Sequence, residues 1–292
     1  MNEVRAAVID IGSNSIRYFN ATVTPQGVAA FAPKHLITTR LAEGILQTGC
    51  LQEAAMERSL LAILKFCALA AEHGTQTVYA YATSAVRDAK NRDAFLGRVR
   101  QACNIKVDVL SGVEEARLAY LGATGQFGGG LIDIGGGSAQ VIAPNLAHSA
   151  PIGCVRAKEL CTGLTQEEVP QAIEAWLNQT IKDKLTGIEE QRWTGVGGTI
   201  TTLGALQAGL AEYDSLRVNH ETLAQEDVLS LYERLLAMGE ARRQHPLLTD
   251  RHDIILFGAL ILYGLMRRLD IDMLHVSDAD GMEGYLMDRV AR

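Results

Sequence analysis

Two segments of the chain share an order of residue types that is suited to binding phosphate. In each, an apolar run ends in an aspartate and is followed by a turn of glycine and serine, and then by a second apolar run; the segments are residues 8–15 and 131–138. Glycine allows turn conformations that other residues avoid and lets a ligand approach the backbone closely. Successive N–H groups form an anion-binding concavity, and serine hydroxyls add donors. The predicted phosphate-binding residues of these turns are Gly12, Ser13, Asn14, Ser15, Gly135, Gly136, Gly137 and Ser138.

The aspartates of the two segments, Asp10 and Asp133, suggest a metal ion. A bound anion would repel a neighbouring carboxylate unless a cation lay between them, so each copy implies a divalent metal with oxygen ligands. A β-hairpin turn with a capping aspartate would explain either copy alone. Two copies in the same order favour two related halves that face each other, with phosphate and metal in the cleft.

Glu115 is the candidate general base. Ser111 and Glu114 match a capping box, in which the serine binds the N3 amide and the N3 glutamate binds back to the cap. The cap gives Glu114 a structural role and gives none to Glu115, which shares a helix face with mostly small residues. A carboxylate there can accept a proton from water that attacks a phosphorus atom. The alternative is a solvated glutamate on the helix surface.

A third glycine-containing turn, Gly197-Gly198-Thr199, lies between an expected strand and an expected helix. Backbone amides at a helix N-terminus bind phosphate well. A tight turn capped by Thr199 explains the same residues equally well. The chain contains no GxxxxGK[ST] sequence, and this turn does not have the GxGxxG form of a dinucleotide site, which disfavours P-loop and Rossmann assignments.

Two arginines stand beside these segments, Arg17 after the first turn and Arg87 at an expected strand-to-helix junction. The planar guanidinium offers a fixed fork of donors that matches phosphate oxygens. The alternative is a surface ion pair, for Arg87 with Asp88 or Asp93. Weaker candidates of the same kind are Arg40 and Arg251.

One histidine-aspartate pair, His252-Asp253, resembles the motif of a metal phosphohydrolase. That site needs further histidine and aspartate ligands, and the chain has no second such pair. We interpret the pair as a helix-surface dyad and assign the other histidines no role.

The elements that must position these residues form two α/β halves. The apolar patterns predict strands over residues 1–32, 77–82, 107–110, 131–143, 147–152, 193–195 and 273–276, and helices over residues 51–73, 92–103, 111–123, 165–185, 197 onward, 225–240, 251–268 and 282 onward. Strands first in hairpins and then alternating with helices indicate α/β layers. The glycine-rich residues 125–130 mark the boundary between domains 1–124 and 125–292. A last helix that packs on the first domain is compatible with this division.

Composition narrows the class of protein. The 292 residues are 48% hydrophobic and 21% charged, with a net charge of −7, which argues against duplex nucleic acid and a membrane surface as partners. No signal-peptide or membrane-spanning pattern occurs, and the longest apolar stretch, residues 254–266, is too short to span a bilayer. Five cysteines without a CxxC pair fit buried thiols in a reducing compartment. We expect a cytoplasmic protein.

In combination and order, these motifs resemble the exopolyphosphatase/guanosine pentaphosphate phosphohydrolase family of the actin-like ATPase superfamily. The matching segments span nearly the whole chain: residues 10–17, 40–44, 82–89, 111–117, 133–138, 197–203, Arg251 with 258–262, and 276–278. The resemblance implies two ribonuclease-H-like domains around a cleft, without the C-terminal helical domains of longer members. It also implies Mg²⁺-dependent (or Mn²⁺-dependent) removal of a terminal phosphate.

By matched position, the resemblance makes Glu115 the catalytic base, and Asp10 and Asp133 metal-binding or water-positioning acids. It makes the glycine turns phosphate loops, and Arg17, Arg87 and Arg251 ligands of a polyanion. Two departures stand out. Ala139-Gln140 replaces the family's Thr-Glu, and Gly281-Met282-Glu283-Gly284 replaces its Leu-Arg-Glu-Gly. Glutamine keeps the size of glutamate and loses its charge, which would weaken metal binding.

The sequence therefore predicts hydrolysis of the terminal phosphoanhydride of inorganic polyphosphate. Guanosine pentaphosphate is the alternative substrate, and a non-catalytic protein that binds polyphosphate or guanosine penta- or tetraphosphate is the alternative of another class. The sequence is compatible with a monomer and with a homodimer.

Overall fold

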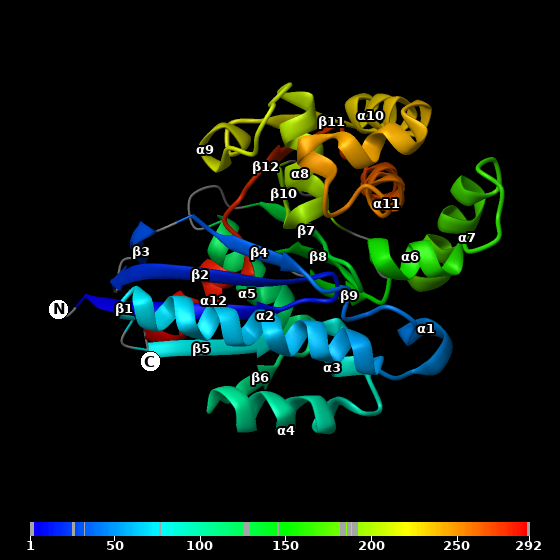
Figure 1. The fold of residues 1–292 in the computed structure, drawn as a ribbon. Coiled ribbons are helices and arrows are strands. Elements are labelled where there is room, and N and C mark those ends of the chain that lie inside the picture. The colour runs from blue at the N-terminus through cyan, green and yellow to red at the C-terminus, as the bar shows by residue number, and fades with distance from the viewer. Residues whose placement is uncertain are drawn as a thin grey trace. The chain divides into compact units, whose positions relative to one another are not determined.

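The computed structural model divides into two compact units, each with one mixed β-sheet. The first unit is Met1–Gly122 with Gly281–Arg292, and the second is Ala123–Asp280. The structure describes residues 3–24, 27–31, 33–75, 77–124, 129–144, 146–181, 185, 188 and 192–290. The predicted α/β class is confirmed, and both units can be followed in Figure 1.

The first unit contains a six-stranded sheet and most of the N-terminal half of the chain. Its elements are β1 (Val4–Ile11), β2 (Ser15–Thr24), β3 (Gly27–Phe31), β4 (His35–Thr38), α1 (Ile45–Thr48), α2 (Glu53–Glu72), β5 (Thr77–Ala82), α3 (Ser84–Asp88), α4 (Arg92–Cys103), β6 (Val107–Val109), α5 (Gly112–Thr124) and α12 (Gly281–Val290). The strand order is β3-β2-β1-β5-β6, with β4 pairing with β2. Strands β1, β2 and β3 are antiparallel, whereas β5 and β6 run parallel to β1.

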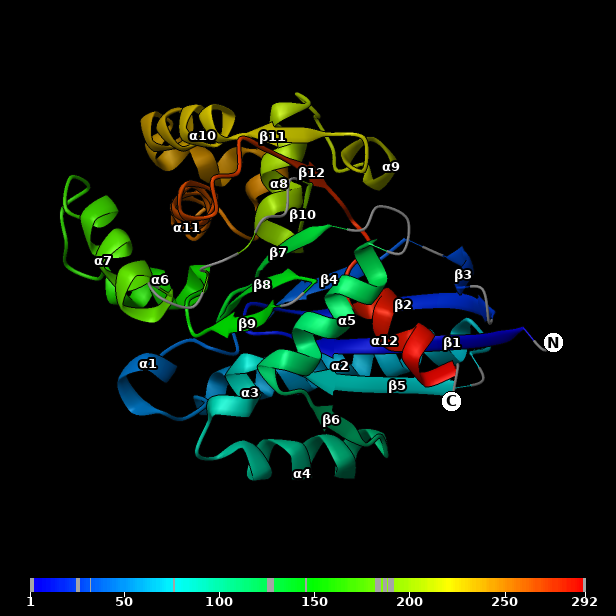
Figure 2. The same ribbon diagram turned by 180° about the vertical axis from the view of Figure 1, so that it is seen from behind.

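Helices cover both faces of this first sheet. Helix α2 lies on one face (Figure 1). Its Phe66 ring stacks on the Tyr18 ring of β2. Helices α5 and α12 lie on the other face (Figure 2). The two helices approach each other very closely at Gly284 of α12. A Cβ atom at that position would lie 1.9 Å from the Leu118 carbonyl oxygen of α5. Only glycine permits this packing, which holds α5 close to α12.

The second unit repeats the strand arrangement of the first. Its elements are β7 (Gly130–Ile134), β8 (Ala139–Ala143), β9 (Leu146–Ala150), α6 (Cys154–Leu160), α7 (Val169–Ile181), β10 (Trp193–Val196), α8 (Gly197–Gln207), α9 (Ser215–Val218), β11 (Thr222–Ala224), α10 (Gln225–Ala237), the 3₁₀ turns Gly239–Gln244 and Pro246–Leu248, α11 (Ile255–Arg268) and β12 (Met273–Val276). The order is β11-β12-β10-β7-β8-β9. Three antiparallel strands, β7 to β9, are again followed by strands parallel to the first of them, β10 and β12.

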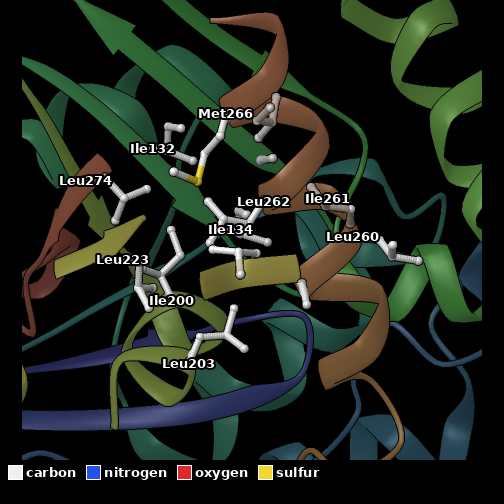
Figure 3. Close-up of a cluster of buried hydrophobic side chains, with 14 of the residues drawn as sticks. Ile132, Ile134, Ile200, Leu203, Leu223, Leu260, Ile261, Leu262, Met266 and Leu274 are labelled. Carbon is white, nitrogen blue, oxygen red and sulfur yellow. The ribbon is translucent and has the colours of Figure 1, made fainter. Parts of the chain in front are cut away.

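The core of the second unit lies between its sheet and helices α8 and α11. Figure 3 shows side chains from β7, α8, β11, α11 and β12 converging there, among them Ile132, Ile200, Leu262 and Met266. Each buried aliphatic side chain of this size contributes about 1.5–3 kcal/mol relative to exposure. The apolar stretch at residues 254–266 is therefore a buried core helix, as its length predicted. Among the described residues, no helix combines the length and apolar character needed to cross a bilayer.

Long elements match the sequence predictions, and short ones were missed. Strands 77–82 and 273–276 and helix 92–103 are confirmed to the residue. The helix predicted for residues 165–185 is described as Val169–Ile181, and residues 182–184 lie outside the described residues, as do 125–128 of the predicted boundary. The predicted helix at 251–268 begins only at Ile255, after a turn. The missed elements are β4, α1, α3, α6, α9 and β11.

Candidate active site

The first glycine-serine turn joins β1 to β2 in the first unit. The Gly12 amide donates a hydrogen bond of 3.1 Å to the Ser15 carbonyl, which closes the turn. A Cβ atom at residue 12 would lie 2.8 Å from that same oxygen, so the turn requires glycine. The adjacent strands place Asp10 directly opposite Arg17 in the antiparallel register.

The carbonyl groups of this turn are held by the segment that follows β4. The amides of Thr39 and Arg40 donate to the Asn14 carbonyl at 3.0 and 2.7 Å, and the Ala42 amide donates to the Ser13 carbonyl at 2.9 Å. Within the described part of the chain, the N–H groups of Ser13 and Asn14 donate to no acceptor. The turn thus fixes its carbonyls by hydrogen bonds and keeps two amides available, as an anion site requires.

Arg17 forms an ion pair with Asp10 across the β1–β2 hairpin. Its Nε atom donates to Asp10 Oδ2 at 2.8 Å, and the two side chains are 26% and 5% exposed. Arg17 thus neutralises the charge of Asp10. An ion pair of this kind was the alternative to phosphate binding by Arg17. The carboxylate predicted to hold metal in this unit therefore has a fixed cation beside it.

The two adjacent glutamates at the start of α5 have different environments. Glu114 forms the predicted capping box: its carboxylate accepts from the Ser111 amide at 2.9 Å, and its amide donates to the Ser111 hydroxyl at 3.2 Å. The Glu115 side chain is only 15% exposed. Burial raises the pKa of Glu115 to about 7, Arg87 opposes this shift, and the charges of Asp10 and Asp88 add to it. Glu115 can thus exchange a proton near neutral pH.

Arg87, at the end of the short helix α3, contacts this glutamate directly. Its Nη1 atom lies 2.9 Å from Glu115 Oε2 and 3.1 Å from the Leu110 carbonyl oxygen, and its Nε atom lies 3.3 Å from Asp88 Oδ1. The sequence anticipated the Asp88 pair but not the pair with Glu115. Helix α3 also contacts the first turn, because the hydroxyl groups of Ser84 and Ser13 are 3.0 Å apart.

The second turn, between β7 and β8, has the same construction. The Gly135 amide donates to the Ser138 carbonyl at 3.0 Å. The amides of Val155 and Arg156 donate to the Gly136 carbonyl at 2.8 and 3.3 Å, and a further bond joins the Cys154 amide to the Gly135 carbonyl. The N–H groups of Gly136 and Gly137 have no acceptor among the residues that the structure describes.

Sequence reasoning missed the helix that clamps this second turn. Helix α6 has only seven residues, and its N-cap, Gly153, supplies no side-chain hydrogen bond. The one sequence clue is Gly153 itself, because a Cβ atom there would lie 2.5 Å from the Gly136 carbonyl. A glycine directly before an apolar helical turn is too common to identify such a contact.

The third turn lies beside the second in the same unit. Gly197 has φ +86°, and a Cβ atom there would lie 2.4 Å from Asp133 Oδ1. A Cβ atom at Gly198 would lie 2.3 Å from the Arg251 guanidinium. Within this unit the fold thus gathers Asp133, the α8 N-terminus and Arg251. Thr199 is buried and does not cap α8, whose N-cap residue Val196 also lacks a side-chain cap.

Gln140 lies directly opposite Asp133 in the β7–β8 register. It is 1% exposed, and its amide nitrogen donates to the hydroxyls of Ser138 at 2.9 Å and Ser149 at 3.2 Å. Its carbonyl oxygen Oε1 is buried and accepts no hydrogen bond within the described residues. Leaving a buried amide oxygen unpartnered costs about 1–3 kcal/mol, which a cation or a donor at this position would offset.

The second unit therefore has oxygen donors that fit a divalent cation. Mg²⁺ is usually held by one or two carboxylates with waters and substrate phosphates, so Asp133 and the Gln140 carbonyl fit in kind. No group of three or more histidine, cysteine, aspartate or glutamate ligands occurs among the described residues. His252 and Asp253 lie in the turn before α11 and form separate contacts, with the Thr249 carbonyl and with Lys158.

The second departure from the family pattern lies in the core. Met282 of α12 is fully buried with Tyr285 and Leu286, in the apolar cluster of the first unit. It packs against the face of the sheet that α5 also covers. The structure thus gives this methionine a packing role.

Comparisons with known proteins agree with the resemblance. The model of the Ppx/GppA phosphatase family matches residues 31–292. Exopolyphosphatase 2 of Mycobacterium tuberculosis is 31% identical over 312 aligned residues, which cover 97% of this chain and 98% of the relative. The guanosine-5'-triphosphate,3'-diphosphate pyrophosphatase of Photobacterium profundum is 28% identical, over 98% of this chain and 59% of the relative. The crystal structure of an exopolyphosphatase-like protein matches with a TM-score of 0.90 and 29% identity, and the alignment covers all of both chains.

Proposed function

Because the chain belongs to the Ppx/GppA phosphatase family, we propose that it hydrolyses the terminal phosphoanhydride bond of inorganic polyphosphate and releases phosphate. The observation that carries this proposal is the side chain of Glu115, a largely buried carboxylate with a pKa of about 7 beside a turn whose amides are available to an anion. A general base is most effective when its pKa lies near the working pH.

In the proposed reaction, Glu115 accepts a proton from the attacking water molecule. The amides of Ser13 and Asn14, in the same unit as Glu115, donate to phosphoryl oxygens. Phosphoryl transfer depends mainly on positioning and on stabilising charge, so these groups are sufficient in kind. A divalent cation held by Asp133 and Gln140 would supply neutralisation of the phosphoryl charge when bound. Arg251, whose guanidinium lies close to Gly198, would add a donor in this proposal.

The relative from Photobacterium supports a second candidate substrate, the 5'-phosphate end of guanosine pentaphosphate. The bond broken and the base would be the same, and the two substrates would differ only in the group beyond the terminal phosphates. Comparing kcat/KM for the two substrates separates these candidates, whereas competition between them would not.

The test is phosphate release from polyphosphate, guanosine pentaphosphate and ATP, with Mg²⁺ and with excess chelator, by the wild type and by Glu115→Ala. We expect Mg²⁺-dependent release that is fastest from polyphosphate and is lost in the variant. Binding of polyphosphate by calorimetry without phosphate release at any Mg²⁺ concentration would instead identify a non-catalytic binding protein. Faster release from guanosine pentaphosphate would select the second substrate.

A further inference from the structure

We propose that Arg87 is a positioning residue, which holds the Glu115 carboxylate in the orientation of a base. The inference deepens the proposed function and rests on Glu115 acting as the base there. It changes the role that the sequence assigned to Arg87, and it follows from the contacts of one guanidinium group.

Two of the three nitrogen atoms of this guanidinium, Nε and Nη1, already have acceptors in the first unit. Nη1 is shared between Glu115 Oε2 at 2.9 Å and the Leu110 carbonyl at 3.1 Å, and Nε points to Asp88 Oδ1 at 3.3 Å. The Arg87 side chain is 21% exposed. A donor that already serves a carboxylate and a carbonyl must break those bonds before it can bind a phosphate oxygen.

The Leu110 contact makes this an orienting interaction as well as an ion pair. Leu110 immediately precedes Ser111, whose hydroxyl caps α5, so one guanidinium contacts both the entrance of that helix and the carboxylate on its first turn. The planar fork of arginine can serve two acceptors in fixed directions, whereas lysine acts as a point charge. The Arg87 carbonyl in turn accepts a hydrogen bond of 3.3 Å from Arg92.

The charges around Glu115 indicate what the loss of Arg87 would do. Asp88 of α3 and Asp10 of β1 both disfavour an ionised Glu115, and Arg87 is the cation that opposes them. Asp10 itself is paired with Arg17. Without Arg87, burial and two carboxylates would keep Glu115 protonated to a higher pH, and a protonated carboxyl cannot act as the base.

The decisive experiment compares Arg87→Gln with the wild type in kcat and KM from pH 5.5 to 9.5. We expect the acid limb of kcat to move upward by about one pH unit, so that activity falls about fivefold at pH 7, approaches a tenfold loss at pH 6, and is largely regained at high pH. KM should change less than about threefold. Arg87→Lys should shift the acid limb less than Arg87→Gln does, because lysine keeps the positive charge and loses only the second contact. The control, Arg100→Gln at an exposed position of α4, should leave the profile unchanged.

A titration of the glutamate side chains by ¹³C NMR tests the same inference without any substrate. The Glu115 resonance is assigned by its absence in Glu115→Gln, and we expect its midpoint to move upward in Arg87→Gln. A large rise in KM at every pH with an unmoved acid limb would overturn the inference, as would an unmoved Glu115 midpoint. If no substrate is turned over, the proposed function fails, while this titration still decides the role of Arg87.

Discussion

The two glycine turns have the same backbone construction and differ in the residue opposite the aspartate. In both, a glycine amide closes the turn onto a serine carbonyl, a neighbouring segment binds the inner carbonyls, and two amides remain available. Asp10 faces Arg17 in the first copy, whereas Asp133 faces Gln140 in the second. One aspartate has a cation built into the fold, and the other has a neutral amide with an unpartnered oxygen within the described residues.

This difference separates two tasks that the sequence had assigned to both copies. A carboxylate beside a neutral oxygen donor offers a divalent cation two ligands of the kind Mg²⁺ prefers. We therefore propose that metal binding belongs to the second unit and that the base and its control belong to the first.

The largest effect should come from removing the base of the first unit. Glu115→Gln keeps the size of the side chain and removes its ability to accept a proton, so kcat should fall about 100- to 10,000-fold. Mg²⁺ binding, measured by calorimetry, should not change, since the two tasks lie in different units. A variant that keeps more than a tenth of wild-type kcat would end the assignment of Glu115 as the base.

Glu115→Gln should also change stability with pH. Because the folded pKa of Glu115 is raised to about 7, the unfolded chain loses this proton at lower pH, and stability falls as pH rises between those two values. Glu115→Gln removes the penalty, so it should unfold at a higher temperature than the wild type at pH 8, and the gain should shrink at pH 5. Thermal melts at both pH values measure it, and an equal gain at the two pH values would contradict the shifted pKa.

Removing the built-in cation should destabilise the first unit. Arg17→Gln leaves the buried Asp10 carboxylate without its ion pair to Arg17, which should lower the free energy of unfolding by about 2–3 kcal/mol at pH 7.5. Urea denaturation at pH 7.5 measures it, with the exposed Arg92→Gln as the control. A deficit no larger than the control's would show that the pair contributes little.

The second unit should respond to a charge at residue 140. Gln140→Glu places two carboxylates opposite each other, so Mg²⁺ affinity should rise about tenfold, or about 1.4 kcal/mol. In excess chelator the same variant should be less stable than the wild type, because the two like charges repel. Calorimetry and thermal melts with and without Mg²⁺ test both expectations. Unchanged affinity would place the cation elsewhere.

The sequence predicted the two turns, the longer α/β elements and the capping box of α5 because each is encoded locally. Val8 to Ser15 contains its own strand, aspartate and turn, and Ser111 with Glu114 contains its own cap. The contacts that give these residues their environment are not local. Arg87 lies 28 residues before Glu115, and the register that places Gln140 opposite Asp133 appears only when the hairpin is formed.

Short elements without caps account for most of what was missed. Helix α6 lacks a capping side chain, and the segment that binds the first turn is irregular backbone after β4. Both act through backbone amides, which any residue type except proline supplies. Patterns of side chains therefore could not reveal them, although they determine how each turn presents its amides.

The smallest expected effect concerns the neighbour of the base. The Glu114 carboxylate accepts from the Ser111 amide, which holds its pKa below the usual range, so it stabilises the α5 terminus at neutral pH. Glu114→Gln should lower the free energy of unfolding by about 1 kcal/mol or less, the scale of a cap contact. The difference should fade as acidification through the lowered pKa protonates the wild-type carboxyl. Phosphate release should stay within about twofold of the wild type, and a loss as large as that of Glu115→Gln would refute the division between a capping and a catalytic glutamate.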